Sequence, residues 1–168
     1  MFDSLALIVF PLLMIFAALA DLFTMTIPNR VSLLLIGVYF ALVLYLRVPV
    51  ETVALHASAG AGMLLITFGM YYFRWIGGGD AKLAAASALW LGWGLLPQYG
   101  VVASLAGGVV TLLILELRRH DLPQRIMSIE FVARLADKNG GVPYGIALAV
   151  AGLIVYPQSQ LWMKLAGL

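Results

Sequence analysis

The chain has 168 residues, of which 63% are hydrophobic and 11% are charged, and its mean hydropathy is +1.02. These values exclude an ordinary soluble globular domain and indicate an integral membrane protein. The formal net charge of +2 gives no sign of nucleic-acid binding. The absence of cysteine excludes disulfides, thiolate metal sites and thiol nucleophiles.

Six stretches are long and apolar enough to predict membrane-spanning helices. In chain order they cover residues 5–20, 31–46, 52–73, 81–96, 99–117 and 142–162. The first stretch lacks the basic start and the cleavage site of a signal peptide, so we interpret it as a span. Small residues in the third and fourth stretches predict close helix packing. We therefore expect an all-α, six-helix transmembrane bundle that forms one domain over residues 1–168.

Lysine and arginine gather in alternate connections between these spans. The first, third and fifth connections hold all but two of the 10 basic residues, and the opposite side has only Arg47 and Lys164. Short loops rich in lysine and arginine stay in the cytoplasm. We expect the odd-numbered connections in the cytoplasm and both termini outside.

The fifth connection, residues 118–141, is the only long one. Its charged residues fall on one arc of a helical wheel: Glu130, Arg134, Asp137 and Lys138. Its apolar residues fall across from them: Ile129, Phe131, Val132 and Leu135. This pattern predicts an amphipathic helix on the cytoplasmic surface. The alternative is a solvated linker that contains a Glu130–Arg134 helix pair.

Two aspartates stand at the ends of predicted spans. Asp21 follows the first span directly, where the helix dipole disfavours a negative charge. Asp80 opens the fourth span after Gly77, Gly78 and Gly79. The structural alternatives are an ordinary boundary residue for Asp21 and a helix N-cap for Asp80. The expected orientation puts both at the cytoplasmic side, and ionisable groups near the hydrocarbon are candidates for function.

Two neighbouring carboxyl groups can share one proton, because repulsion opposes the second ionisation. Such a pair can hydrolyse a peptide bond when one carboxylate takes a proton from the attacking water and the other carboxyl donates a proton to the carbonyl oxygen. No metal or other cofactor is needed. The glycine run lets the backbone bend and a substrate strand approach closely. We expect Asp21 and Asp80 to be the catalytic pair.

Three segments in order along the chain carry a family resemblance: DLFTMTIPN at 21–29, GGGDAKL at 77–83 and PYG at 143–145. Together they resemble the motifs of the type IV prepilin peptidase family, membrane aspartic proteases with a G-x-G-D signature. The resemblance implies that Asp21 and Asp80 are catalytic and that the glycines before Asp80 shape the site. It implies substrate-binding or site-shaping positions at four further residues and at Gly145: Asn29, Lys82, Pro143 and Tyr144.

The resemblance also implies a prepilin or pilin-like substrate, cut after its basic leader at the cytoplasmic face of the bacterial inner membrane. Larger family members carry an insert with paired cysteines that is associated with N-methylation. This short chain without cysteine resembles the compact peptidase-only branch that serves tight-adherence (Flp-type) pili. We therefore expect no N-methyltransferase activity.

The main alternative from another class is a small ion- or proton-coupled transporter in which Asp21 and Asp80 bind a cation or relay protons. A carrier should place these acids near mid-membrane, whereas a protease should place them near one face. A structural membrane subunit is a third interpretation. Presenilin-type Tyr-Asp and Pro-Ala-Leu motifs are absent, as are a G-x-S-x-G context for His56 or His120 and an H-E-x-x-H helix.

Overall fold

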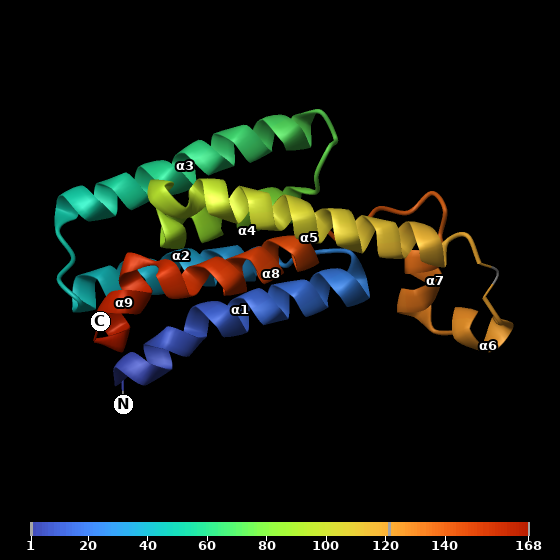
Figure 1. The fold of residues 1–168 in the computed structure, drawn as a ribbon, viewed down its shortest axis with the longest axis horizontal. Helices are drawn as coiled ribbons and strands as arrows, with labels where there is room; N and C mark the ends of the chain where they lie inside the picture. Colours follow the sequence, from blue (N-terminus) through green and yellow to red (C-terminus); the bar gives the residue numbers. More distant parts are fainter. Residues whose placement is uncertain (1, 121, 168) are drawn as a thin grey trace.

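The computed structural model describes residues 2–120 and 122–167, and within these it contains helices and no strand. In chain order the elements are α1 (Phe2–Thr24), α2 (Asn29–Tyr45), α3 (Val50–Tyr72), α4 (Gly78–Leu91), η1 (Trp93–Leu95), α5 (Leu96–Leu117), α6 (Gln124–Met127), α7 (Glu130–Ala136), α8 (Gly145–Val155), η2 (Tyr156–Gln158) and α9 (Gln160–Ala166). The long helices run side by side, with α6 and α7 at one end and α9 at the other (Figure 1). The expectation of an all-helical protein is confirmed for the described residues.

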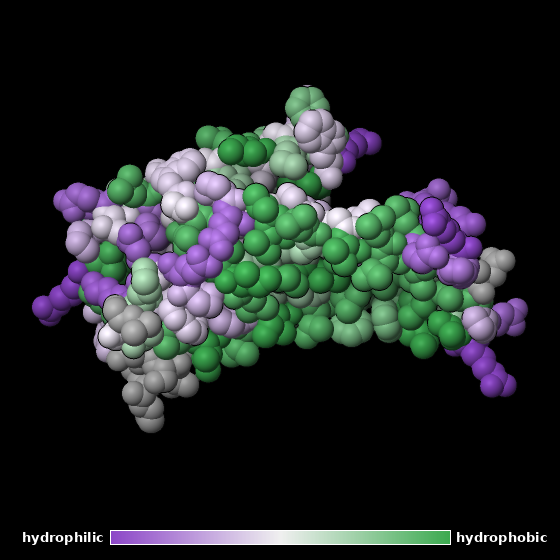
Figure 2. Space-filling model, viewed as in Figure 1, coloured by the Kyte–Doolittle hydropathy of each residue, from purple (hydrophilic) through white to green (hydrophobic). Residues whose placement is uncertain are grey.

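Apolar side chains cover the middle of the visible surface, and polar ones gather at its two ends (Figure 2). Leu65 of α3 and Leu113 of α5, for example, are 74% and 66% exposed. In the described part of the chain, α1, α3 and the η1–α5 segment are long and apolar enough to cross a membrane. The last segment adds a fourth crossing if its bent pair counts as one span. The shorter α2 and α4 fall outside that set, so six crossings remain an expectation.

Two predicted spans differ from the helices that form. α4 ends at Leu91 because Gly92 adopts a left-handed backbone with φ of 68°. The residues after it form η1 and lead into α5, so the stretch predicted as a span over 81–96 is not one continuous helix. A bend of 54° separates Gly145–Gln158 from α9, so the stretch predicted as a span over 142–162 is not one straight helix either. Pro157 lies in η2 and Ser159 is extended, which interrupts the helical hydrogen bonds.

α4 lies in the interior of the bundle and packs against α3, α2 and α8. From Ala81 onward each of its residues is buried except Lys82. A Cβ on Gly60 of α3 would come within 3.2 Å of the Leu89 Cβ, so the two helices approach closely. The Thr67 hydroxyl of α3 also donates to the Ala81 carbonyl at 3.2 Å. The close packing expected from the small residues is confirmed.

The long fifth connection forms two short helices instead of one long one. α7 covers only seven residues and ends at Ala136, so Asp137 and Lys138 lie beyond it. The predicted Glu130–Arg134 pair forms within α7. The Phe131 ring meets the Phe23 ring of α1 at a centroid distance of 5.1 Å. α7 therefore packs on the end of α1, and its predicted place on a membrane surface stays an expectation.

Candidate active site

Asp21 lies in the last turn of α1 and is 5% exposed. Its Oδ2 atom accepts a 2.7 Å hydrogen bond from the backbone N–H of Gly145, the first residue of α8. A Cβ on Gly145 would come within 2.8 Å of the same oxygen. The lack of a side chain at Gly145 thus allows a backbone donor from α8 to reach the carboxyl group.

Asp80 lies in the first turn of α4 and is partly buried. Its Oδ2 atom accepts a 3.2 Å hydrogen bond from the N–H of Gly77, which is the N-cap residue. The interpretation of Asp80 as the N-cap is therefore wrong, because Asp80 is the third residue after the N-cap. Its carboxylate still accepts a hydrogen bond from a backbone donor at the start of the helix. Burial, together with the charge of Asp21, raises the pKa of Asp80 to about 6, while the Gly77 hydrogen bond acts in the opposite direction.

Ile27, between α1 and α2, lies against the glycine neighbours of both aspartates. A Cβ on Gly79, next to Asp80, would come within 3.0 Å of the Ile27 Cβ. A Cβ on Gly145, which binds Asp21, would come within 2.6 Å of the Ile27 Cδ1. Sequence reasoning missed Ile27, although it stands inside the 21–29 motif. The two aspartates thus belong to one neighbourhood at the end of the bundle that bears α7.

A cavity of about 670 Å³ opens beside Asp80. Of the predicted residues, Gly77 and Tyr144 line it as well, and the described residues that line it do not include Asp21. Its other walls come from the loop after α3, from α5 and from the segment before α8. Within the described residues, no three His, Asp or Glu side chains gather as metal ligands. The Asp80 carboxyl group thus lines the cavity, whereas the Asp21 carboxyl group does not.

Tyr144 holds the segment before α8 against α5, and Pro143 precedes it in the chain. Pro143 is fully buried. The Tyr144 ring fills a notch at Gly107 of α5, where an added Cβ would overlap the ring. The Tyr144 hydroxyl donates to the Ala103 carbonyl at 3.4 Å. Tyr144 therefore shapes the wall of the Asp80 cavity, whereas Pro143 is not among the residues that line it.

Three further predicted residues do not line the Asp80 cavity: Lys82, Asn29 and Gly78. The Lys82 Nζ donates to the Asn29 Oδ1 at 2.8 Å and so joins α4 to the start of α2. Both residues line a separate cavity of about 310 Å³ between α2, α3 and α4. Gly78 lies against the Tyr71 ring, 3.3 Å from where its Cβ would be. Lys82 and Asn29 thus connect the helices around the site and do not line the Asp80 cavity.

Arg118 is the C-cap residue of α5. The sequence alone identifies it only as one of the basic residues of the fifth connection. Its Nε donates to the Leu135 carbonyl at 2.9 Å, and its Nη2 donates to the Gly141 carbonyl at 2.7 Å. Gly141 lines the Asp80 cavity. Because both acceptors are backbone carbonyls, no side-chain pattern in the sequence could reveal this link between α5, α7 and the segment before α8.

Three curated bacterial proteins named prepilin leader peptidase/N-methyltransferase are similar to this chain. The protein from Pectobacterium carotovorum is 34% identical over 122 residues, which cover 69% of this chain and 43% of the relative. The protein from Dickeya chrysanthemi is 37% identical over 120 residues, covering 66% and 41%. The protein from Aeromonas salmonicida is 31% identical over 143 residues, covering 80% and 42%. The chain thus spans less than half the length of these relatives.

No solved structure matches the chain. The model of the type IV leader peptidase family matches residues 8–112, a segment that contains Asp21, Asp80 and the glycines before Asp80. This match covers more than half of the chain, and it agrees with the names of the similar proteins. The chain belongs to the type IV leader peptidase family.

Proposed function

We propose that this chain is a membrane-embedded aspartic endopeptidase that removes the basic leader from type IV prepilins or pilin-like precursors. The observation that supports the proposal is that Ile27 lies against Gly79, next to Asp80, and against Gly145, which binds Asp21, while Asp80 lines a cavity of about 670 Å³. Both aspartates lie in the segment that the family model matches. The cavity gives an extended peptide access to Asp80 from one end of the bundle.

The two carboxyl groups take different roles in this proposal. Asp80 lines the cavity, and burial and the charge of Asp21 raise its pKa, so Asp80 holds the proton of the pair while ionised Asp21 removes a proton from the attacking water. The resulting hydroxide bonds to the scissile carbonyl carbon while Asp80 donates its proton to the carbonyl oxygen. The tetrahedral intermediate then breaks its C–N bond. Asp21 returns its proton to the leaving amine, and Asp80 recovers the proton from the hydroxyl as the new carboxylic acid forms.

We also propose that the chain is a single domain that crosses the bacterial inner membrane six times, with α2 and α4 as short crossings inside the bundle. Both termini then lie outside, and the aspartates lie at the cytoplasmic face. The basic residues of the fifth connection support this orientation, because they lie at the same end as Asp21 and Asp80. In this arrangement α7 rests on the cytoplasmic surface beside the end of α1.

The proposed substrates are prepilins of the tight-adherence (Flp) type, and the proposed activity is peptide cleavage without N-methylation. The similar proteins carry both activities in their name, whereas the paired cysteines that the family resemblance associates with N-methylation are absent from this chain. Mass spectrometry of the pilin product, made with S-adenosylmethionine present, tests this point. We expect an unmodified amino terminus, and a product heavier by one methyl group would contradict the restriction.

A transporter that uses the same two aspartates is less well supported. Asp21 lies in the last turn of α1 and Asp80 in the first turn of α4, at one end of the bundle. A carrier needs its acidic groups on a path that opens to both sides, near the middle of the membrane. The cavity beside Asp80 instead lies at one end of the bundle, where Asp80 itself is found.

The decisive experiment measures cleavage of a candidate prepilin by the full chain in lipid vesicles. Asp21→Asn and Asp80→Asn should each slow cleavage about a thousandfold or more, because the proton transfers are lost. Glu51→Gln is the matched control, since Glu51 is an exposed carboxylate in the first turn of α3. It should leave the rate unchanged. Substantial cleavage by either aspartate variant that still inserts and elutes as the parent does would overturn the proposal.

A further inference from the structure

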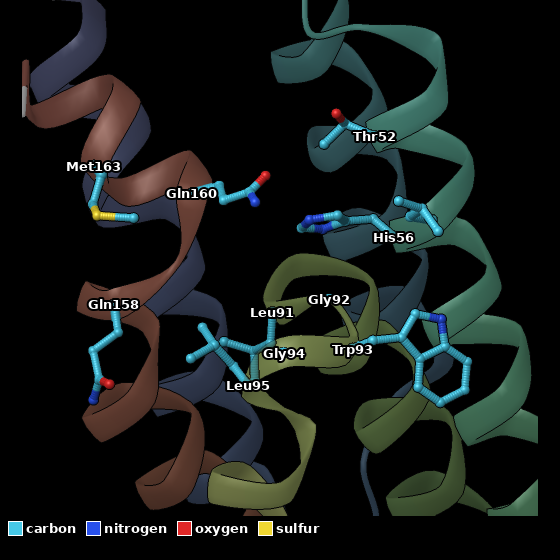
Figure 3. A pocket seen from close by; sticks show the side chains of 11 residues that line it. Thr52, His56, Leu91, Gly92, Trp93, Gly94, Leu95, Gln158, Gln160 and Met163 are labelled. Atoms are coloured by element: carbon cyan, nitrogen blue, oxygen red, sulfur yellow. The ribbon is translucent and has the colours of Figure 1, made fainter.

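A second polar cavity lies at the end of the bundle away from the aspartates. Its volume is about 470 Å³, and residues from α3, from the Gly92–Leu95 turn and from the η2–α9 region line it (Figure 3). A smaller cavity of about 130 Å³ adjoins it and shares Thr52, His56 and Gln160 as lining residues. The proposed peptidase reaction uses none of these side chains.

His56 presents a buried hydrogen-bond acceptor to this cavity. The residue is 7% exposed, and its Nδ1 lies 2.9 Å from the Leu89 carbonyl oxygen. A carbonyl only accepts, so Nδ1 carries the proton and Nε2 of the neutral ring is an acceptor. Nε2 lies beside Gly92, where an added Cβ would come within 2.8 Å, and Gly92 lines the cavity. Tyr39 stacks on the ring at a centroid distance of 6.0 Å and fixes it in place.

The remaining polar groups complement this acceptor. Figure 3 shows the Gln160 amide and the His56 ring pointing toward one another across the cavity. Thr52 and Gln158 add a hydroxyl and a second amide to the lining. Lys164 lines the adjoining smaller cavity, and among the described residues no acidic side chain pairs with it. A cation beside neutral donors and one acceptor matches a phosphate group that carries hydroxyls.

The cavity also has an apolar edge that continues into the outer surface. Leu55 and Met163 line it and are 61% and 40% exposed. The middle of the visible surface is covered by apolar side chains (Figure 2). Apolar residues at the rim of a cavity in such a chain suit contact with lipid acyl chains. A ligand that fits both parts has a polar head and an apolar tail.

We propose that this cavity, together with the smaller cavity that adjoins it, binds the phosphoglycerol headgroup of an anionic phospholipid. Lys164 and Gln160 bind the phosphate oxygens, and a glycerol hydroxyl donates to the Nε2 of His56. The acyl chains leave along Leu55 and Met163. A zwitterionic lipid fits less well, because its own cation would lie near Lys164 and its choline group has no hydrogen-bond donor for His56.

Native mass spectrometry of the full chain, freed of lipid in detergent, tests the proposal by titration with phosphatidylglycerol and with phosphatidylcholine of the same acyl chains. Gln160→Leu and Lys164→Gln should each weaken retention of phosphatidylglycerol about tenfold, because each removes a hydrogen bond to a charged group. Gln98→Leu and Arg47→Gln are the matched controls. Both residues are exposed, and neither lines the two cavities.

Preferential retention of phosphatidylglycerol, lost in the two cavity variants and kept in the two controls, would support the site. Equal retention of both lipids, or equal effects of cavity and control variants, would overturn it. Free glycerol 3-phosphate forms the last arm of the experiment. If it binds at the same residues while the lipid does not, the ligand is a soluble phosphoglycerol and the lipid assignment is wrong. Size-exclusion profiles equal to the parent's are required of every variant.

Discussion

Asp21 and Asp80 are held in place in different ways. The Asp21 carboxyl is buried and accepts its hydrogen bond from Gly145, on a helix near the other end of the chain. The Asp80 carboxyl is only partly buried and accepts its hydrogen bond from Gly77, three residues earlier. Asp21 therefore depends on the docking of α8, whereas Asp80 is placed by its own helix start and faces a cavity.

Because of this difference, the cleavage rate should depend on distant substitutions through one aspartate and on pH through the other. Changes far away in the sequence, along α8 or the segment before it, should act through the position of Asp21. Changes of proton concentration should act through Asp80, because this is the residue that the cavity exposes to water. Four experiments can test this division, and the first of them should change the rate most.

Gly145→Ala should lower the rate of prepilin cleavage about a hundredfold, because a displacement of about 1 Å in a catalytic group has this order of effect. The new Cβ would come within 2.8 Å of the Asp21 Oδ2 and push the carboxyl away from its donor. Gly108→Ala is the control, since an added Cβ at Gly108 meets nothing within 4 Å. Single-turnover cleavage assays measure both. A Gly145→Ala variant as active as Gly108→Ala would show that the α8 contact does not set the position of Asp21.

The pH profile of kcat/KM should report the ionisation of Asp80. The pKa of Asp80 is raised from 3.8 to about 6, and as the acid it must be protonated. Cleavage should therefore be strong near pH 5 and fall about tenfold per pH unit above about pH 7. An aspartic acid with an ordinary pKa would already lose its proton near pH 4. A rate that stays level up to pH 8, or rises between pH 6 and pH 8, would contradict the assignment of Asp80 as the acid.

Arg118→Gln should lower cleavage about tenfold, since it removes charge-assisted hydrogen bonds to the carbonyls of Leu135 and Gly141. The effect should appear in kcat more than in KM, because Arg118 acts through the segment that leads to Gly145. Arg119→Gln is the control, because the Arg119 side chain is 76% exposed and pairs only with Glu116 among the described residues. Equal rates in the two variants would remove Arg118 from the positioning of the site.

Lys82→Gln should have the smallest effect, about twofold to fivefold in rate, because it removes one exposed hydrogen bond to Asn29. The bond joins α4 to the start of α2 and lies outside the Asp80 cavity. Lys138→Gln serves as the control, because Lys138 is exposed and lies beyond the end of α7. A loss as large as that of Asp80→Asn would assign Lys82 a direct part in the reaction.

The sequence predicted the helical membrane class and the approximate extents of α1, α2, α3 and α5, because these follow from long runs of apolar residues. It also predicted that the two aspartates lie at the same end of the molecule. It did not predict the end of α4 at Gly92 or the bend before α9. Apolar residues continue past both points, so hydropathy alone cannot separate a straight helix from a broken one.

Residue type and spacing were thus sufficient to determine which carboxyl groups to examine and what chemistry two acids can perform. Only the tertiary structure decided which groups hold them. The donor to Asp21 and the acceptors of Arg118 are backbone atoms, which every residue has, so they leave no signature in the sequence. The need for a residue without a side chain at position 145 and the contacts of Ile27 arise only when α1, α4 and α8 pack together. A close approach involves two segments, so the sequence of either segment alone cannot predict it.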